Sequence, residues 1–265
     1  MDTQKDIEKY AAEYTNFGFE IRVAKIFRQQ NWDVQHSGTY VDPISKKNRE
    51  FDLRARKAFS RLPYTVQLAV ECKQISPSFP LVVQSVLRTD DEAFHDIINY
   101  AQNGYQPHVA RARSFSLYKF GLGQWVGKSF DQVGRNAKNE FTASDSKVFD
   151  KMSQAINSAE ALIQRSLPDG GQSKDTRHII LPVLVVPDGC LWKYDENGEM
   201  IDRPGKVTSA QYFINQAWPF EVNGISASYT MSHLEIVTFS EIATFLNNLI
   251  NEDLRVHREK IFRID

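Results

Sequence analysis

A short apolar run that ends in two opposite charges constrains this chain more than any other stretch. Residues 66–73 read Val-Gln-Leu-Ala-Val-Glu-Cys-Lys, a composition typical of a buried β-strand. Side chains alternate between the two faces of a strand, so Glu71 and Lys73 project to the same side. A Glu-x-Lys triplet is expected about once by chance in a chain of this size, so its surroundings must decide what it means.

A second carboxylate is predicted to lie opposite Glu71. Residues 49–56 form another strand-like run, which contains Asp52, and residues 64–73 follow after a short loop. Two strands with so short a connection predict an antiparallel hairpin. The midpoint between Asp52 and Glu71 falls between positions 61 and 62, inside the loop, so the two residues are expected to lie nearly opposite each other. Their proximity is therefore predicted from the register alone.

Hydrophobic periodicity predicts the other elements. Apolar residues recur at three and four positions over residues 4–30, which predicts a helix that carries Glu20 and is interrupted at Gly18. The further expected elements are strands at 31–34, 178–186, 190–194 and 234–239, and helices at 90–101, 146–167 and 240–249. The strand at 190–194 is expected to pair with the strand before it. This order predicts an α/β fold, a mixed β-sheet flanked by helices, in one domain spanning 1–265 with an insertion at about 77–145.

Composition narrows the functional classes. The formal net charge of -1 gives no global affinity for nucleic acid, so nucleic-acid contact would need a local basic patch. The two cysteines, Cys72 and Cys190, form neither a disulfide framework nor a zinc motif. The N-terminal residues contain no apolar signal region, and the longest apolar run, near Leu181–Val186, is too short to span a bilayer. We therefore expect a cytoplasmic protein with no membrane partner.

Three carboxylates at one edge of a sheet suit a hard divalent cation. Mg²⁺ and Mn²⁺ prefer oxygen ligands such as Asp52, Glu71 and Glu20, and they usually keep several waters. Such an ion polarises a phosphate and lowers the pKa of bound water. Lys73 would orient the attacking water or neutralise the charge that develops on phosphorus. The residues thus predict Mg²⁺-dependent phosphodiester hydrolysis, with Mn²⁺ as a substitute. The alternative is a solvated Glu71–Lys73 ion pair in an unrelated α/β protein.

These motifs, in this order, resemble the PD-(D/E)xK nuclease superfamily and are most similar to its Mrr-like restriction-endonuclease branch. The matching stretches are Gly18-Phe19-Glu20, Asn31-Trp32-Asp33-Val34, Phe51-Asp52-Leu53 and Val70-Glu71-Cys72-Lys73. The resemblance implies a restriction-endonuclease-like fold. It also implies that Asp52, Glu71 and the Cys72 carbonyl bind the metal, that Glu20 supports a metal or its waters, and that Lys73 assists the water. Two positions depart from the pattern: Phe51 replaces a proline, and Gln154 is followed by Ser158 rather than by the tyrosine of a Gln-x-x-x-Tyr motif.

Basic residues around the predicted hairpin favour a nucleic-acid substrate. The candidate phosphate-contacting residues are Lys46, Lys47, Arg49, Arg54 and Arg56; the alternative is a solvated hairpin surface. The resemblance implies an endonuclease that acts on DNA, with RNA as the second substrate class, in restriction or phage defence. Such an enzyme would work as a homodimer or with a separate targeting protein. A second hypothesis is a catalytically inactive nucleic-acid-binding or assembly module with the same fold.

Overall fold

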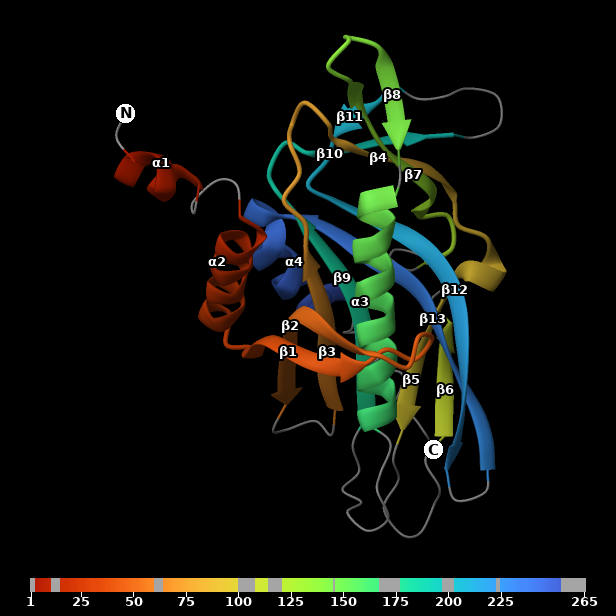
Figure 1. Cartoon of the computed structure of the whole chain (residues 1–265). Coiled ribbons are helices and arrows are strands. Elements are labelled where there is room, and N and C mark those ends of the chain that lie inside the picture. Colours follow the sequence, from red (N-terminus) through yellow and green to blue (C-terminus); the bar gives the residue numbers. More distant parts are fainter. Residues whose placement is uncertain are drawn as a thin grey trace.

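One large mixed β-sheet organises the chain (Figure 1). The computed structural model describes residues 3–10, 15–59, 64–99, 108–113, 121–144, 146–166, 177–196, 203–222 and 225–253. The helices are α1 (Thr3–Lys9), α2 (Asn16–Gln29), α3 (Ser146–Arg165) and α4 (Ile242–Asn248), with short helical turns η2 (Asp90–Glu92), η3 (Phe239–Glu241) and η4 (Leu249–Asp253). The strands that build the site are β1 (Asp33–Val41), β2 (Asn48–Phe59), β3 (Tyr64–Cys72) and β9 (Arg177–Val186). The others are β4 (Leu81–Leu87), β5 (Phe94–Asn99), β6 (His108–Arg113), β7 (Trp125–Arg135), β8 (Phe141–Ser144), β10 (Leu191–Asp195), β11 (Gly205–Lys206), β12 (Ser209–Val222) and β13 (Ile225–Thr238).

The strand order joins an antiparallel meander to parallel strands. The main path through the sheet is β1-β2-β3-β9-β13-β12-β7-β4-β10-β11, while β5, β6 and β8 pair beside it. β1 and β3 each run antiparallel to β2, which lies between them, and β9 lies parallel to both β3 and β13. The carboxyl end of β3 therefore lies inside the sheet, flanked by β2 and β9. The structure confirms the predicted mixed sheet flanked by helices.

Helices cover both faces of this part of the sheet. In Figure 1, α3 crosses one face, while α2 and α4 lie on the other side. Alternation along β3 explains this layering, because Ala69 packs with the α3 cluster whereas Leu68 and Val70 pack with the α2 and α4 cluster. β9 is apolar on both faces, as expected for a strand buried between two helical layers. Because side chains alternate along β3, Glu71 lies on the same face as Ala69, which is the face covered by α3.

The hairpin register agrees with the sequence prediction. Leu53 pairs with Val70 and Phe59 pairs with Tyr64, so the next pair along the hairpin is Asp52 with Glu71. The strands continue further into the connection than the sequence indicated, and residues 60–63 lie outside the described part of the chain. The long helix is also confirmed: α3 buries Val148, Met152 and Ile163 on one face.

Three sequence predictions are wrong. The helix break expected at Gly18 lies earlier in the chain, because α1 ends at Lys9 and Gly18 lies inside α2. The helix expected at 90–101 is only a short turn, η2, followed by strand β5, which pairs with β6 and β9. Strand pairing with distant segments overrides the local helical periodicity here. The strand expected at 190–194 exists as β10, but it pairs with β4 and β11 and not with β9. β4 comes from the region expected to be an insertion, so that region extends the same sheet.

The helices of the described residues are too short or too polar to cross a bilayer. None of them combines the length with the apolar character that a membrane span needs.

Candidate functional site

Asp52 and Glu71 hold each other in place at the end of the β2–β3 hairpin. The backbone N–H of Cys72 donates to Asp52 Oδ2 at 2.8 Å, and the backbone N–H of Asp52 donates to Glu71 Oε1 at 3.3 Å. Each carboxylate is thus fixed by the main chain of the neighbouring strand. Two negative groups held by peptide N–H groups keep a defined spacing, which is what a cation site requires.

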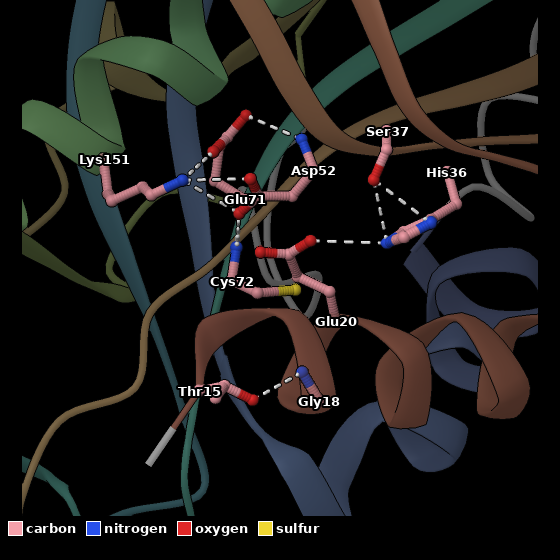
Figure 2. A network of polar contacts seen from close by, with 9 residues as sticks. All are labelled: Thr15, Gly18, Glu20, His36, Ser37, Asp52, Glu71, Cys72 and Lys151. Carbon is pink, nitrogen blue, oxygen red and sulfur yellow. Dashed lines mark hydrogen bonds and ion pairs between the residues drawn. The ribbon is translucent and has the colours of Figure 1, made fainter. Parts of the chain in front are cut away.

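A lysine from α3 binds both carboxylates. Lys151 Nζ lies 3.0 Å from each oxygen of Asp52 and 2.7 Å from Glu71 Oε2. Figure 2 shows this ammonium reaching from α3 into the space between the two acids. Three carboxylate oxygens therefore converge on one positive charge. The hairpin partners were predicted from the sequence, but Lys151 was not.

Burial sets the electrostatics of this cluster. Glu71 is 0% exposed, and burial, with a further contribution from the charge of Asp52, raises the pKa of Glu71 to about 8 despite the opposing effect of Lys151. Burial alone would lower the pKa of Lys151, but the charges of Glu71 and Asp52 outweigh it and raise that pKa above the usual lysine value. The buried cluster therefore favours retention of a proton on Glu71 and of the positive charge on Lys151.

Glu20 approaches the same strand end from the opposite helical layer. It lies in the second turn of α2. Thr15 is the N-cap of this helix, and its side chain accepts a hydrogen bond from the Gly18 N–H at 3.0 Å. Figure 2 places Glu20 beside Cys72, with its carboxylate turned toward His36. His36 Nε2 lies 3.3 Å from Glu20 Oε2. Burial, followed by the charge of Asp52, raises the pKa of Glu20, so the third predicted carboxylate is electrostatically part of the cluster.

Cys72 and Lys73 complete the predicted motif. The Cys72 thiol is buried in the apolar cluster beneath α2, and burial raises its pKa well above the usual thiol value. It is therefore a packing group, while its main chain remains beside Asp52. Lys73 is half-buried, and its backbone N–H donates to Val185 O at 2.9 Å, which fixes the strand end against β9. The catalytic role expected for Lys73 stays a prediction.

The five candidate phosphate-contacting residues have different surroundings. Arg54 is 5% exposed, donates from Nε to Ser158 Oγ at 3.2 Å and stacks over Phe51. It shares the α3 side of β2 with Asp52, as alternation predicts. Arg49 lies 3.0 Å from Asp42 Oδ2 but is half exposed. The exposed members are Lys46, Lys47 and Arg56. A nucleic-acid role for any of them stays a prediction.

The donor set fits a small, hard divalent cation. Asp52 and Glu71 supply several carboxylate oxygens around a single position, and hard cations choose such ligands. Within the described ranges, no three His, Cys, Asp or Glu side chains meet in a metal-binding arrangement. An ion would therefore be held by Asp52, Glu71 and the Cys72 carbonyl, with water for the rest of its shell, as Mg²⁺ commonly is.

Comparison with known proteins adds no relative. Neither a family model, nor a curated protein, nor a solved structure matches this chain.

The sequence did contain a weak signal for Lys151. Lys151, Ala155 and Ser158 recur at helical spacing, and the last two are buried against the sheet. A lysine on the same stripe must direct its ammonium toward a polar partner in the sheet. Gln154, the first residue of the incomplete Gln-x-x-x-Tyr motif, instead accepts a hydrogen bond on its backbone carbonyl from the Tyr40 hydroxyl at 3.4 Å.

Proposed function

We propose that this chain is a metal-dependent nuclease that hydrolyses the phosphodiester bonds of DNA. The observation that carries the proposal is the convergence of three oxygens from Asp52 and Glu71 on one cation position. This position lies at the end of a strand, where the flanking main chain fixes both carboxylates. Fixed oxygen ligands at a strand end are a suitable support for phosphoryl-transfer chemistry.

The residues of the site have distinct tasks in this proposal. Asp52 and Glu71 bind Mg²⁺ or Mn²⁺, which when bound polarises the phosphate and lowers the pKa of water. The backbone N–H groups of Cys72 and Asp52 hold the two carboxylates in fixed positions through hydrogen bonds. Lys73 orients the attacking water, and Glu20 adds negative charge and holds water at the edge of the site. Each role is tested by substitution at its own position.

The order of elements supports a restriction-endonuclease-like fold of the Mrr-like type. α2, β1, β2 and β3 are followed by the extension, then by α3 and β9, and Asp52 and Glu71 occupy the expected strands. The proposal carries the expected partners with it. These are DNA as substrate, RNA as the second class, and either a second copy of this chain or a targeting protein, in restriction or phage defence.

The deciding experiment is a cleavage assay with matched variants. The purified protein should nick or cut plasmid, linear or single-stranded DNA with Mg²⁺ or Mn²⁺ and not with EDTA. Asp52→Asn and Glu71→Gln keep shape and remove charge, and each should abolish cleavage. Glu50→Gln, an exposed position on the same strand β2, is the control and should cleave normally. Cleavage that survives in Glu71→Gln sinks the proposal.

A second candidate function is a nucleic-acid-binding or assembly module without catalysis. The observation that favours it is the ion pair itself, because Lys151 already binds the two carboxylates that a metal would need. This candidate predicts that the chain binds DNA equally well with and without metal, and that it does not cleave the DNA. Calorimetric titration with Mn²⁺ separates the two: the nuclease binds Mn²⁺ in the wild type and loses that binding in Asp52→Asn, whereas the module shows no Asp52-dependent binding. If the chain shows neither Asp52-dependent Mn²⁺ binding nor DNA binding, the result would favour an unrelated α/β protein.

A further inference from the structure

We propose that Lys151 is an internal competitor for the metal position, so that its side chain must leave the two carboxylates before a divalent cation can bind. This inference rests on the proposed function and deepens it, because it concerns how the same site is regulated. It predicts that the metal-free protein is held in a closed state by an ion pair between α3 and the β2–β3 hairpin.

The geometry excludes simultaneous occupation. Lys151 Nζ accounts for both oxygens of Asp52 and for Glu71 Oε2, all within 3.0 Å. Mg²⁺ needs its ligand oxygens at about 2.0–2.1 Å. An ion bound by Asp52 and Glu71 would therefore lie almost in contact with the ammonium, and two like charges at that distance repel strongly in a poorly solvated site.

The carboxylates cannot yield, so the lysine must. Glu71 is 0% exposed and Asp52 is fixed by the Cys72 N–H. Lys151 lies in the second turn of α3, and its side chain keeps 17% of its surface exposed. The helix is anchored by Val148 and Met152, which are buried on either side of this position. Rotation of the flexible lysine stem toward solvent is therefore the simplest way to open the site, with α3 left in place.

This competition should weaken metal binding in the wild type. A site that must first release its own ammonium binds a ligand with an affinity reduced by the fraction of open molecules. Removing the ammonium should remove that reduction. Lys151→Met keeps the length and apolar stem without the charge, and Lys151→Gln keeps a polar end that can still bond the carboxylates. Lys25→Met, at an exposed position on α2, is the control.

The first test measures Mn²⁺ binding directly, by the electron paramagnetic resonance signal of free Mn²⁺ and by calorimetry, at pH 8.5 where carboxyl protonation competes least. Lys151→Met and Lys151→Gln should each bind Mn²⁺ about tenfold more tightly than the wild type, a difference of about 1.4 kcal/mol. Lys25→Met should match the wild type. Equal or weaker binding in both Lys151 variants overturns the inference while leaving the proposed function intact.

The second test uses the unaltered protein and needs no variant to fold. Acetylation of lysines, followed by peptide mass spectrometry, should modify Lys151 slowly without metal and at least severalfold faster with Mn²⁺. Lys25 should react at one rate in both conditions. An unchanged Lys151 rate at saturating Mn²⁺ overturns the inference. If neither the wild type nor the Lys151 variants bind Mn²⁺ through Asp52, the proposed function itself fails and the inference falls with it.

Discussion

The ammonium of Lys151 lies 2.7 Å from the carboxylate of Glu71, which has no exposure to solvent. The two residues are 80 positions apart in the chain, so this contact ties α3 to the end of β3. A buried carboxylate is costly unless a cation or hydrogen-bond donors compensate it. The ion pair therefore contributes to folding as well as to the candidate site.

Lys151→Met should destabilise the metal-free protein by about 2–4 kcal/mol, because it leaves two carboxylates close together without their cation. Urea unfolding in EDTA measures this. The double variant Lys151→Met/Glu71→Gln should recover part of the loss, since only one charge then remains. A single variant as stable as Lys25→Met would contradict the assignment of Lys151 as the stabilising cation.

The sequence predicted the half of the site that local geometry determines. Asp52 and Glu71 lie on two strands joined by a short connection, so their register follows from the chain itself. Lys151 is different, because its place depends on how α3 packs across the sheet. That packing is a long-range property, which neither hairpin register nor helical periodicity specifies.

The same distinction between local geometry and long-range packing explains two wrong predictions about the fold. Residues 90–101 have a helical spacing of apolar groups, yet β5 forms there because β9 and β6 offer partners to it. β10 follows β9 in the chain, which predicts that the two strands pair. In the structure β10 pairs with β4 and β11 instead. Pairing between distant strands decided both outcomes.

Glu20→Gln should reduce the proposed cleavage activity by only about tenfold, whereas Asp52→Asn should abolish it. The reason is that Glu20 faces His36, at 3.3 Å, and belongs to the cluster through charge rather than through the shared cation position; groups that only position others usually cost about 10–100-fold. Initial rates on plasmid DNA with Mg²⁺ give the comparison. A complete loss in Glu20→Gln, with Mn²⁺ binding also lost, would instead make Glu20 a direct ligand.

Arg54→Ala should destabilise the fold by about 2–4 kcal/mol, because its guanidinium bonds Ser158 and stacks 4.3 Å from the Phe51 ring centroid. Arg56→Ala, at an exposed position on the same strand, should change stability by less than about 0.5 kcal/mol. If Arg56 contacts phosphate, its loss also weakens DNA binding and lowers the salt dependence by about one ion. Thermal unfolding and DNA titrations at several salt concentrations measure these effects. Equal stability of the two variants would contradict the structural role of Arg54.

A buried polar network should make Arg88 indispensable to stability. Arg88 is 1% exposed, donates from Nη2 to Gln211 Oε1 at 2.7 Å, and Gln211 in turn donates to Glu235 Oε1 at 2.7 Å. Burial lowers the pKa of Arg88 to about 10, although the charges of Glu235 and Glu92 oppose that change. Arg88→Met should cost about 3–5 kcal/mol, because Gln211 loses its buried donor and the favourable charge of Arg88 near the buried Glu235 is removed.

The matched control for Arg88 is Arg203→Met, at an exposed position, which should unfold like the wild type. Adding Glu235→Gln to Arg88→Met should cost less than the sum of the two single changes, because the two residues belong to one network. Additive losses in urea unfolding would contradict the coupling between them.

His178 should make the fold sensitive to acid between about pH 6.5 and pH 4. Burial, with a contribution from the charge of Arg56, lowers the pKa of His178 to about 4. The unfolded chain takes up a proton near pH 6.5 while the folded chain does not, so stability falls with pH across this window and the loss is complete below pH 4. The shift corresponds to as much as about 3 kcal/mol.

The neutral ring also fits its neighbour, since the Gln67 side-chain amide lies 3.2 Å from His178 Nδ1 as a donor. His178→Gln keeps an acceptor for Gln67 and removes the titration. The free energy of unfolding of the wild type relative to His178→Gln, measured by urea between pH 4 and pH 8, should therefore decline toward acid. Buried carboxyl groups with raised pKa values, such as Glu71, act in the opposite direction in both proteins and cancel in this difference. A difference that stays constant with pH would mean that His178 accepts its proton in the folded protein as readily as in the unfolded chain.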